Sequence, residues 1–209
     1  DGVAPFDSIR LASIGEAAFT LDIMSVIKGE KMRIQGIHVD KLFLNAIVLE
    51  DGTANYDIMK ETETAAGDST DVRDEYVILL EKYSFTNAHI IYDNRSMQMF
   101  VDMDGLDHSG KGDLSDKIYD LFTITTMKKL DVIYEGTQYM KNADAEINAT
   151  FDIQDDFRVY NLKENEIRVN ELYLTASGVV LMPEDGVDMD ITYQSTKTDL
   201  KNVLSLVPA

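Results

Sequence analysis

The C-terminal half of the chain alternates apolar and polar residues with a period of two. In residues 145–153 the apolar positions are Ala145, Ile147, Ala149, Phe151 and Ile153. Successive side chains of a β-strand point to opposite faces, so this pattern predicts a strand with one apolar and one polar face. Residues 172–182 and 187–193 repeat the pattern. Several such strands joined by short polar breaks predict an antiparallel sheet with one apolar face that must be shielded from water.

Two short segments have helical character instead. Asp22 can cap a single turn that contains Ile23 and Ile27, and Gly29 would end it. Near the C-terminus, apolar residues recur at helical spacing, namely Leu200, Val203, Leu204 and Val207. The expected fold is therefore mainly β. We predict an elongated, twisted antiparallel sheet, groove-like or a half-open barrel, with one or two short helices that include a C-terminal amphipathic helix.

The chain divides at an acidic segment. Residues 61–75 are small, polar and acidic with little periodicity, which is typical of a linker or loop. The segment separates an N-terminal β part, residues 1–60, from a C-terminal β part, residues 76–209, and the two parts can still belong to one continuous sheet. In the C-terminal part, further strands are predicted over residues 76–83, 89–92, 97–103, 118–126 and 130–134.

Composition excludes several classes of function. The formal net charge is -19, which disfavours nucleic acid and anionic lipid headgroups because both require clustered Lys and Arg. Cysteine is absent, so disulfides, thiolate nucleophiles and Cys metal sites are excluded. No apolar run approaches the length of about 18 residues that a membrane-spanning helix needs. From its two ends we expect the chain to be a portion of a longer protein whose membrane anchor lies outside it.

No catalytic or metal motif stands out. His38, His89 and His108 are far apart in sequence, and ordinary strand positions explain them better than metal ligation. Residues 102–107 resemble a calcium loop superficially, but their glycine is at the fourth position rather than the sixth. Alternating acids on the polar face of a strand explain them at least as well. We therefore predict no enzyme, no cofactor and no metal site.

Two stretches of the N-terminal part carry a more specific pattern. Residues 21–34 place a short helix before a strand, and residues 47–57 end a strand in Asp51-Gly52-Thr53-Ala54-Asn55-Tyr56-Asp57. This combination resembles a segment of AsmA-family envelope proteins, in which strands end in Asp-Gly-x-x-Asn-(Trp or Tyr)-Asp. Tyr56 stands where many members of the family have Trp.

The C-terminal part resembles the later region of the same family. The matching stretches are residues 160–165, residues 169–172, Gly178 and residues 198–209. The resemblance implies a β-rich protein of the Gram-negative periplasm, anchored in the inner membrane and involved in outer-membrane biogenesis, and it implies movement of phospholipid between membranes. It brings no catalytic residues. Gly52 and Asn55 would form a turn, while Thr198 and Asp199 would start a helix.

A lipid-handling role requires an apolar face that shelters acyl chains. The candidate lipid-facing residues are Met97, Met99, Val101, Ile147, Phe151, Leu172, Leu174, Met189 and Ile191. Two alternatives stay open. The face can instead fold against the terminal helix as an ordinary core, and the protein can be a structural or assembly module that binds an envelope protein through a sheet edge.

Overall fold

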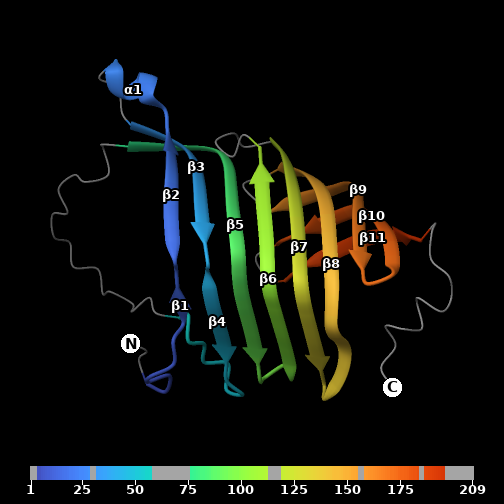
Figure 1. The fold of residues 1–209 in the computed structure, drawn as a ribbon. Coiled ribbons are helices and arrows are strands. Elements are labelled where there is room, and N and C mark those ends of the chain that lie inside the picture. Colours follow the sequence, from blue (N-terminus) through green and yellow to red (C-terminus); the bar gives the residue numbers. More distant parts are fainter. Residues whose placement is uncertain are drawn as a thin grey trace.

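The computed structural model describes residues 4–28, 32–57, 76–112, 119–154, 158–183 and 186–195. The described strands belong to one 11-stranded sheet (Figure 1). The strands are β1 (Ala12–Ser13), β2 (Glu16–Leu21), β3 (Met32–Asp40), β4 (Phe43–Val48), β5 (Tyr76–Asn94), β6 (Met99–Lys111), β7 (Tyr119–Tyr134), β8 (Thr137–Gln154), β9 (Val159–Val169), β10 (Leu172–Leu181) and β11 (Asp188–Gln194). A short helix, α1 (Ile23–Ile27), lies between β2 and β3. The prediction of a mainly β, twisted sheet is confirmed.

The sheet is mixed rather than purely antiparallel. From β5 to β11 each strand pairs antiparallel with the next one along the chain. On its other side β5 pairs parallel with β3 and, lower down, with β4. β2 and β1 then pair antiparallel with β3 and β4. The all-antiparallel prediction is therefore wrong at β5.

The connection before β5 explains this difference. Parallel neighbours need a crossover of about a dozen residues or more, because the chain must return to the end at which it started. Residues 49–75 provide that length, whereas the later connections are short. Alternation along one strand carries no information about the direction of its neighbour, so the pattern of apolar residues did not reveal the parallel pairs.

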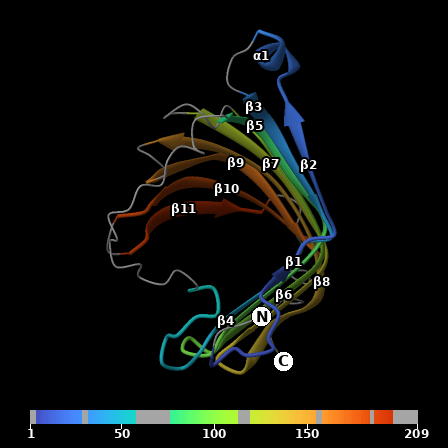
Figure 2. The same ribbon diagram turned by 90° about the vertical axis from the view of Figure 1, so that its left-hand side faces the viewer.

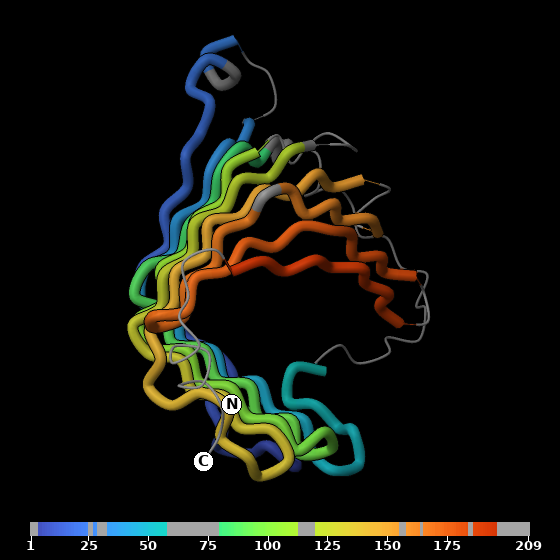
Figure 3. Tube along the Cα trace, turned by 90° about the vertical axis from the view of Figure 1, so that its right-hand side faces the viewer, coloured from blue at the N-terminus to red at the C-terminus, as the bar shows by residue number. Residues whose placement is uncertain are grey.

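The sheet bends sharply across its middle, and its two arms enclose a concave side (Figure 2; Figure 3). We call the arm that contains β2, β3 and β9–β11 the upper arm, and the arm that contains β1 and β4 the lower arm. The long strands β5–β8 run through both arms (Figure 1). The convex side faces the viewer of Figure 1 and is called the outer face below.

A line of irregular residues crosses the sheet at the bend. Backbone φ is positive at Lys41 (54°), Asn87 (52°), Gly105 (61°) and Asn142 (48°). The registers of β5 with β6 and of β7 with β8 shift at the same level. An extra residue in one strand bends that strand and increases its twist. Because the irregularities of neighbouring strands line up, they bend the whole sheet.

These irregularities interrupt the alternation without ending a strand. The predicted strands at residues 76–83 and 89–92 are one strand, β5, which continues through the irregularity at Asn87. Those at residues 118–126 and 130–134 are likewise one strand, β7, with a register shift between Met127 and Leu130. The predicted strand boundaries therefore fall at the bulges of two long strands.

Aspartate side chains accept hydrogen bonds from backbone N–H groups at the bulges. Asp107 Oδ1 accepts a hydrogen bond from the backbone N–H of Asn87 at 2.7 Å. Asp131 Oδ1 accepts one from the backbone N–H of Asn142 at 2.6 Å. Both bonds lie at exposed positions, and each gives a partner to an N–H at an irregular point of the strand. Part of the acidity of this chain therefore serves the bend, in addition to solubility.

The core lies on the inside of the bend. The buried members of its larger cluster are Ala88, Leu106, Met127, Ala143, Ala145 and Val169, and a second cluster contains Leu121 and Ile153. Half-buried side chains from both arms pack against the larger cluster, including Met103 and Leu130 of the lower arm and Ile147 and Ile167 of the upper arm. Side chains of two arms can converge only on the concave side, so the apolar face of the sheet is the concave one.

The first predicted helix is present as α1. The backbone N–H of Met24 donates to Asp22 Oδ1 at 3.0 Å, which is the capping role expected for this aspartate. The predicted C-terminal helix around residues 200–207, with Thr198 and Asp199 at its start, lies outside the described residues, as does the acidic segment 61–75. Within the described part of the chain, no helix is long and apolar enough to cross a membrane.

Candidate functional site

The concave face is the candidate functional surface, and rows of paired residues run across it from strand to strand. One row joins Thr125 of β7 to Ile147 of β8, and continues through Ile167 of β9 to Leu174 of β10. The apolar positions alternate with polar ones that point to the outer face. On β6, β7, β10 and β11, this register and alternation leave no Asp, Glu, Lys or Arg at a concave position within the described strands.

Most of the predicted lipid-facing residues share this face. By the observed registers, the concave positions include Met99, Val101, Ile147, Phe151, Leu172, Leu174, Met189 and Ile191. Met97 is the exception. It belongs to the turn between β5 and β6, where its backbone N–H donates to Asn94 Oδ1 at 3.0 Å and its side chain is 54% exposed. The prediction that Met97 shares the strand face is wrong, because the turn takes it out of the alternation.

The concave face is only partly shielded from water. Large apolar side chains near its two ends are highly exposed, with Phe19 of β2 at 59% and Met189 of β11 at 65%. Among the described elements, the substantial contacts join hydrogen-bonded strands or join α1 to β3. No described element packs over the concave face. A contiguous apolar surface that the described part of the chain leaves open to water is typical of a site of interaction.

A polar cluster lies within the apolar surface. His108 Nδ1 is hydrogen-bonded to Thr125 Oγ1 at 2.8 Å, and His108 Nε2 lies 3.2 Å from the Tyr83 hydroxyl. The imidazole also stacks on Phe85 with ring centroids 6.1 Å apart. Burial lowers the pKa of His108 and raises the pKa of Tyr83. Both groups are therefore held in their neutral forms, which suits them to an apolar surface.

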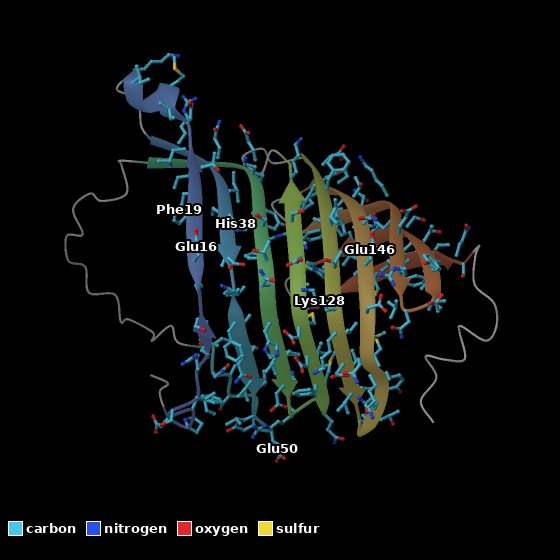
Figure 4. All side chains as sticks on the ribbon, viewed as in Figure 1. Glu16, Phe19, His38, Glu50, Lys128 and Glu146 are labelled. Atoms are coloured by element: carbon cyan, nitrogen blue, oxygen red, sulfur yellow. The ribbon has the colours of Figure 1, made fainter. Side chains whose placement is uncertain are left out.

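The outer face carries the charge. Figure 4 looks at this face and labels His38, Lys128 and Glu146 on it. Three ion-pair groups lie there: Asp102–Lys129–Asp131, Asp120–Lys163 and Asp144–Arg168–Glu146. Hydrogen bonds from Lys129 to Asp102 and Asp131 hold the pKa of its ammonium well above the usual value. The sheet thus separates an apolar inside from a polar outside.

The residues considered as metal ligands have structural partners. His38, His89 and His108 lie in β3, β5 and β6. Residues 102–107 form the middle of β6 rather than a loop. Among the described residues, no three His, Asp or Glu side chains are grouped closely enough to hold a metal ion.

The Asp51–Asp57 motif forms a turn that completes the end of β4. Gly52 has a φ of 86°, and Asp51 Oδ1 accepts the backbone N–H of Thr53 at 2.9 Å. Asn55 is buried at 7% exposure, and its side chain bonds the backbone of Ile47. The structural role inferred for Gly52 and Asn55 agrees with this geometry.

Comparison of the chain with protein-family models, with curated proteins and with solved structures finds no match. The geometry of the sheet and the sequence motifs are therefore the basis for a proposed function.

Proposed function

We propose that this protein binds acyl chains of phospholipids on the concave face of its sheet, as a non-enzymatic lipid-handling module. The observation that carries the proposal is the apolar surface across β5–β11 on the inside of the bend, over which no described element packs. Transfer of a lipid requires no chemical reaction. It requires only an apolar surface that shields the acyl chains from water. The neutral Tyr83, His108 and Thr125 cluster adds hydrogen-bonding groups without charge.

The dimensions and energies suit such a ligand. Neighbouring strands lie about 4.8 Å apart, so the path from β5 to β11 is about 29 Å long. That length is comparable to the hydrocarbon thickness of a bilayer, about 30 Å, which holds two acyl chains end to end. Each buried methylene contributes about 0.8 kcal/mol, so even partial burial of one chain offsets the cost of its ordering.

The sequence resemblance to the AsmA family supplies the setting of this proposal. We place the protein in the periplasm of a Gram-negative bacterium, held at the inner membrane by an anchor outside this chain, with a role in outer-membrane biogenesis. The Asp51–Asp57 turn and the mainly β fold are in keeping with that resemblance.

Mass spectrometry of gently purified protein, together with uptake of a fluorescent fatty acid, tests the proposal. Met189→Asp puts a charge at an exposed concave position of β11, and Thr192→Asp puts the same charge on the outer face of the same strand. Loss of contact with two methylenes would weaken uptake by about tenfold in Met189→Asp. Thr192→Asp should bind normally. Absence of co-purified lipid together with absence of uptake would refute the proposal.

A second candidate is an assembly module that binds an envelope protein through a sheet edge. β2 is exposed along its whole length, and β11 has a described partner on one side only. Open edges of this kind accept an added strand. In that case cross-linking in cells would recover a protein partner at β2 or β11, and the wild type would take up no fatty acid.

A further inference from the structure

Two lysines on the outer face stand directly opposite each other. Lys82 of β5 is the register partner of Lys111 of β6. Directly opposite residues have Cβ atoms about 5 Å apart, and like charges at such positions are destabilising. Neither lysine has an ion-pair or hydrogen-bond partner among the described residues. In a chain with twice as many acidic as basic residues, 38 against 19, such a pair needs an explanation.

The pair lies in a hollow of about 510 Å³ on the outer face of the upper arm. The side chains that line it on this face are Thr20, His38, Lys82, Ser84, Ser109, Lys111, Phe122 and Ile124. Ser84 is next to the lysine row and is hydrogen-bonded to His38 Nδ1 at 2.8 Å. Figure 4 shows His38 on β3, the strand that borders β5. Cations and hydroxyl donors therefore converge from three strands.

A glycine makes room for one of the lysines. Gly36 of β3 is the register partner of both Lys82 and Thr20. A β-carbon at position 36 would lie 2.9 Å from Lys82 Cε and 3.1 Å from Thr20 Oγ1. The aliphatic part of Lys82 thus lies over Gly36, while the residue as a whole remains exposed.

Two nearby aspartates form contacts with residues other than these lysines. Asp120 stands two positions before Phe122 on β7, but its carboxylate is 2.6 Å from Lys163 Nζ. Asp107 accepts a hydrogen bond from the backbone N–H of Asn87 at the bend. Neither of these two carboxylates therefore compensates the charges of Lys82 and Lys111. A bound anion would remove the repulsion between them.

We propose that this hollow, the outer lysine site, binds a phosphate-type oxyanion. Lys82 and Lys111 supply the charge, and Ser84, Ser109 and His38 supply hydrogen-bonding groups. Phe122 and Ile124, which are 55% and 56% exposed, border the lysine pair and suit an apolar group attached to the phosphate. The site goes beyond the proposed function, because it lies on the opposite face of the sheet and needs no acyl chain on the concave face.

Calorimetric titration of the whole chain in low-salt buffer tests the site. The probes are inorganic phosphate and dihexanoylphosphatidic acid below its micelle-forming concentration. Both should bind saturably, and Lys82→Gln or Lys111→Gln should each weaken binding by about tenfold, since each removes a charge-assisted hydrogen bond. Lys141→Gln changes the same charge at an exposed position of the lower arm and should leave binding unchanged. Inorganic phosphate should also raise the melting temperature of the wild type by more than that of either site variant at the same concentration.

The two probes distinguish the sources of the phosphate. Tighter binding of the phosphatidic acid, abolished by Phe122→Ser, identifies a lipid headgroup, whereas equal binding of both probes identifies a free phosphate. Either result supports the oxyanion site. No saturable binding of either probe, or equal binding by the wild type and both lysine variants, would overturn it. Lipid recovered on the concave face in that case would leave the proposed function intact.

Discussion

The ring of Tyr83 on β5 lies directly against Gly110 on β6. A β-carbon at position 110 would be 2.3 Å from Tyr83 Cε1, far closer than two carbon atoms can approach. The two residues are register partners on the concave face, and the Tyr83 hydroxyl is within 3.2 Å of His108 Nε2. Glycine at position 110 is therefore what allows the ring to lie flat on the sheet beside His108.

Gly110→Ala should displace this ring. The substitution overpacks the contact and breaks the bond between Tyr83 and His108, so we expect the free energy of unfolding to fall by about 1–3 kcal/mol. Urea unfolding measures the change. In a Tyr83→Ala background the same substitution should cost little, because the ring is absent. An equal cost in both backgrounds would show that the ring does not occupy the position described.

Gly105→Ala should destabilise the bend. Gly105 has a φ of 61°, and a β-carbon there would also lie 2.7 Å from Lys128 Cδ. A side chain in the left-handed region costs about 1–2 kcal/mol, and we expect at least that loss in the free energy of unfolding. Asn142→Gly, at another positive-φ position of the same bend, should be tolerated. A Gly105→Ala protein as stable as the wild type in urea would contradict the role of this residue.

Asn55→Ala should weaken the end of β4. Asn55 Oδ1 accepts from the backbone N–H of Ile47 at 2.8 Å, and its Nδ2 donates to the carbonyl of Asn45 at 2.7 Å. Removal of this side chain leaves both backbone groups without a partner, at a cost of about 1–3 kcal/mol in the free energy of unfolding. Asn161→Ala, at a half-buried position of β9, provides the comparison in the same urea unfolding experiment. Equal effects of the two substitutions would refute the stabilisation of the end of β4 by the Asn55 side chain.

Asp102 should make stability depend on acid pH. Burial alone would raise the pKa of Asp102, but hydrogen bonds from Lys129 and His89 outweigh burial and lower it. A carboxyl whose pKa is lower in the folded state stabilises the fold above its unfolded pKa of about 3.9, and loses that contribution as the pH falls through the folded value.

The wild type should therefore exceed Asp102→Asn in stability at pH 7, and the difference should shrink below about pH 4. Thermal unfolding between pH 7 and pH 3 measures it, with Asp57→Asn as the same substitution at an exposed position. A difference between the wild type and Asp102→Asn that stays constant over this range would rule out ionic stabilisation through Asp102.

The predictions from sequence were most accurate where a property depends on one strand alone. Leu172 and Leu174, and Met189 and Ile191, alternate with polar neighbours, and each pair lies on the concave face as predicted. Met97 was misplaced because the turn after Asn94 ends the alternation, a signal already present in the Asp93-Asn94 pair. The outer lysine site was missed, since Lys82 and Lys111 become neighbours only through strand pairing.

The order of residues in this chain is enough to predict strands and the side chains that share a face, because the direction of a side chain follows from the local backbone. The parallel placement of β3 and β4 beside β5, the bend at Asn87, Gly105 and Asn142, and the apolar surface that the bend encloses arise only in the folded sheet. These features depend on hydrogen bonds between residues far apart in the chain, and the order of residues along a single strand does not encode those partners.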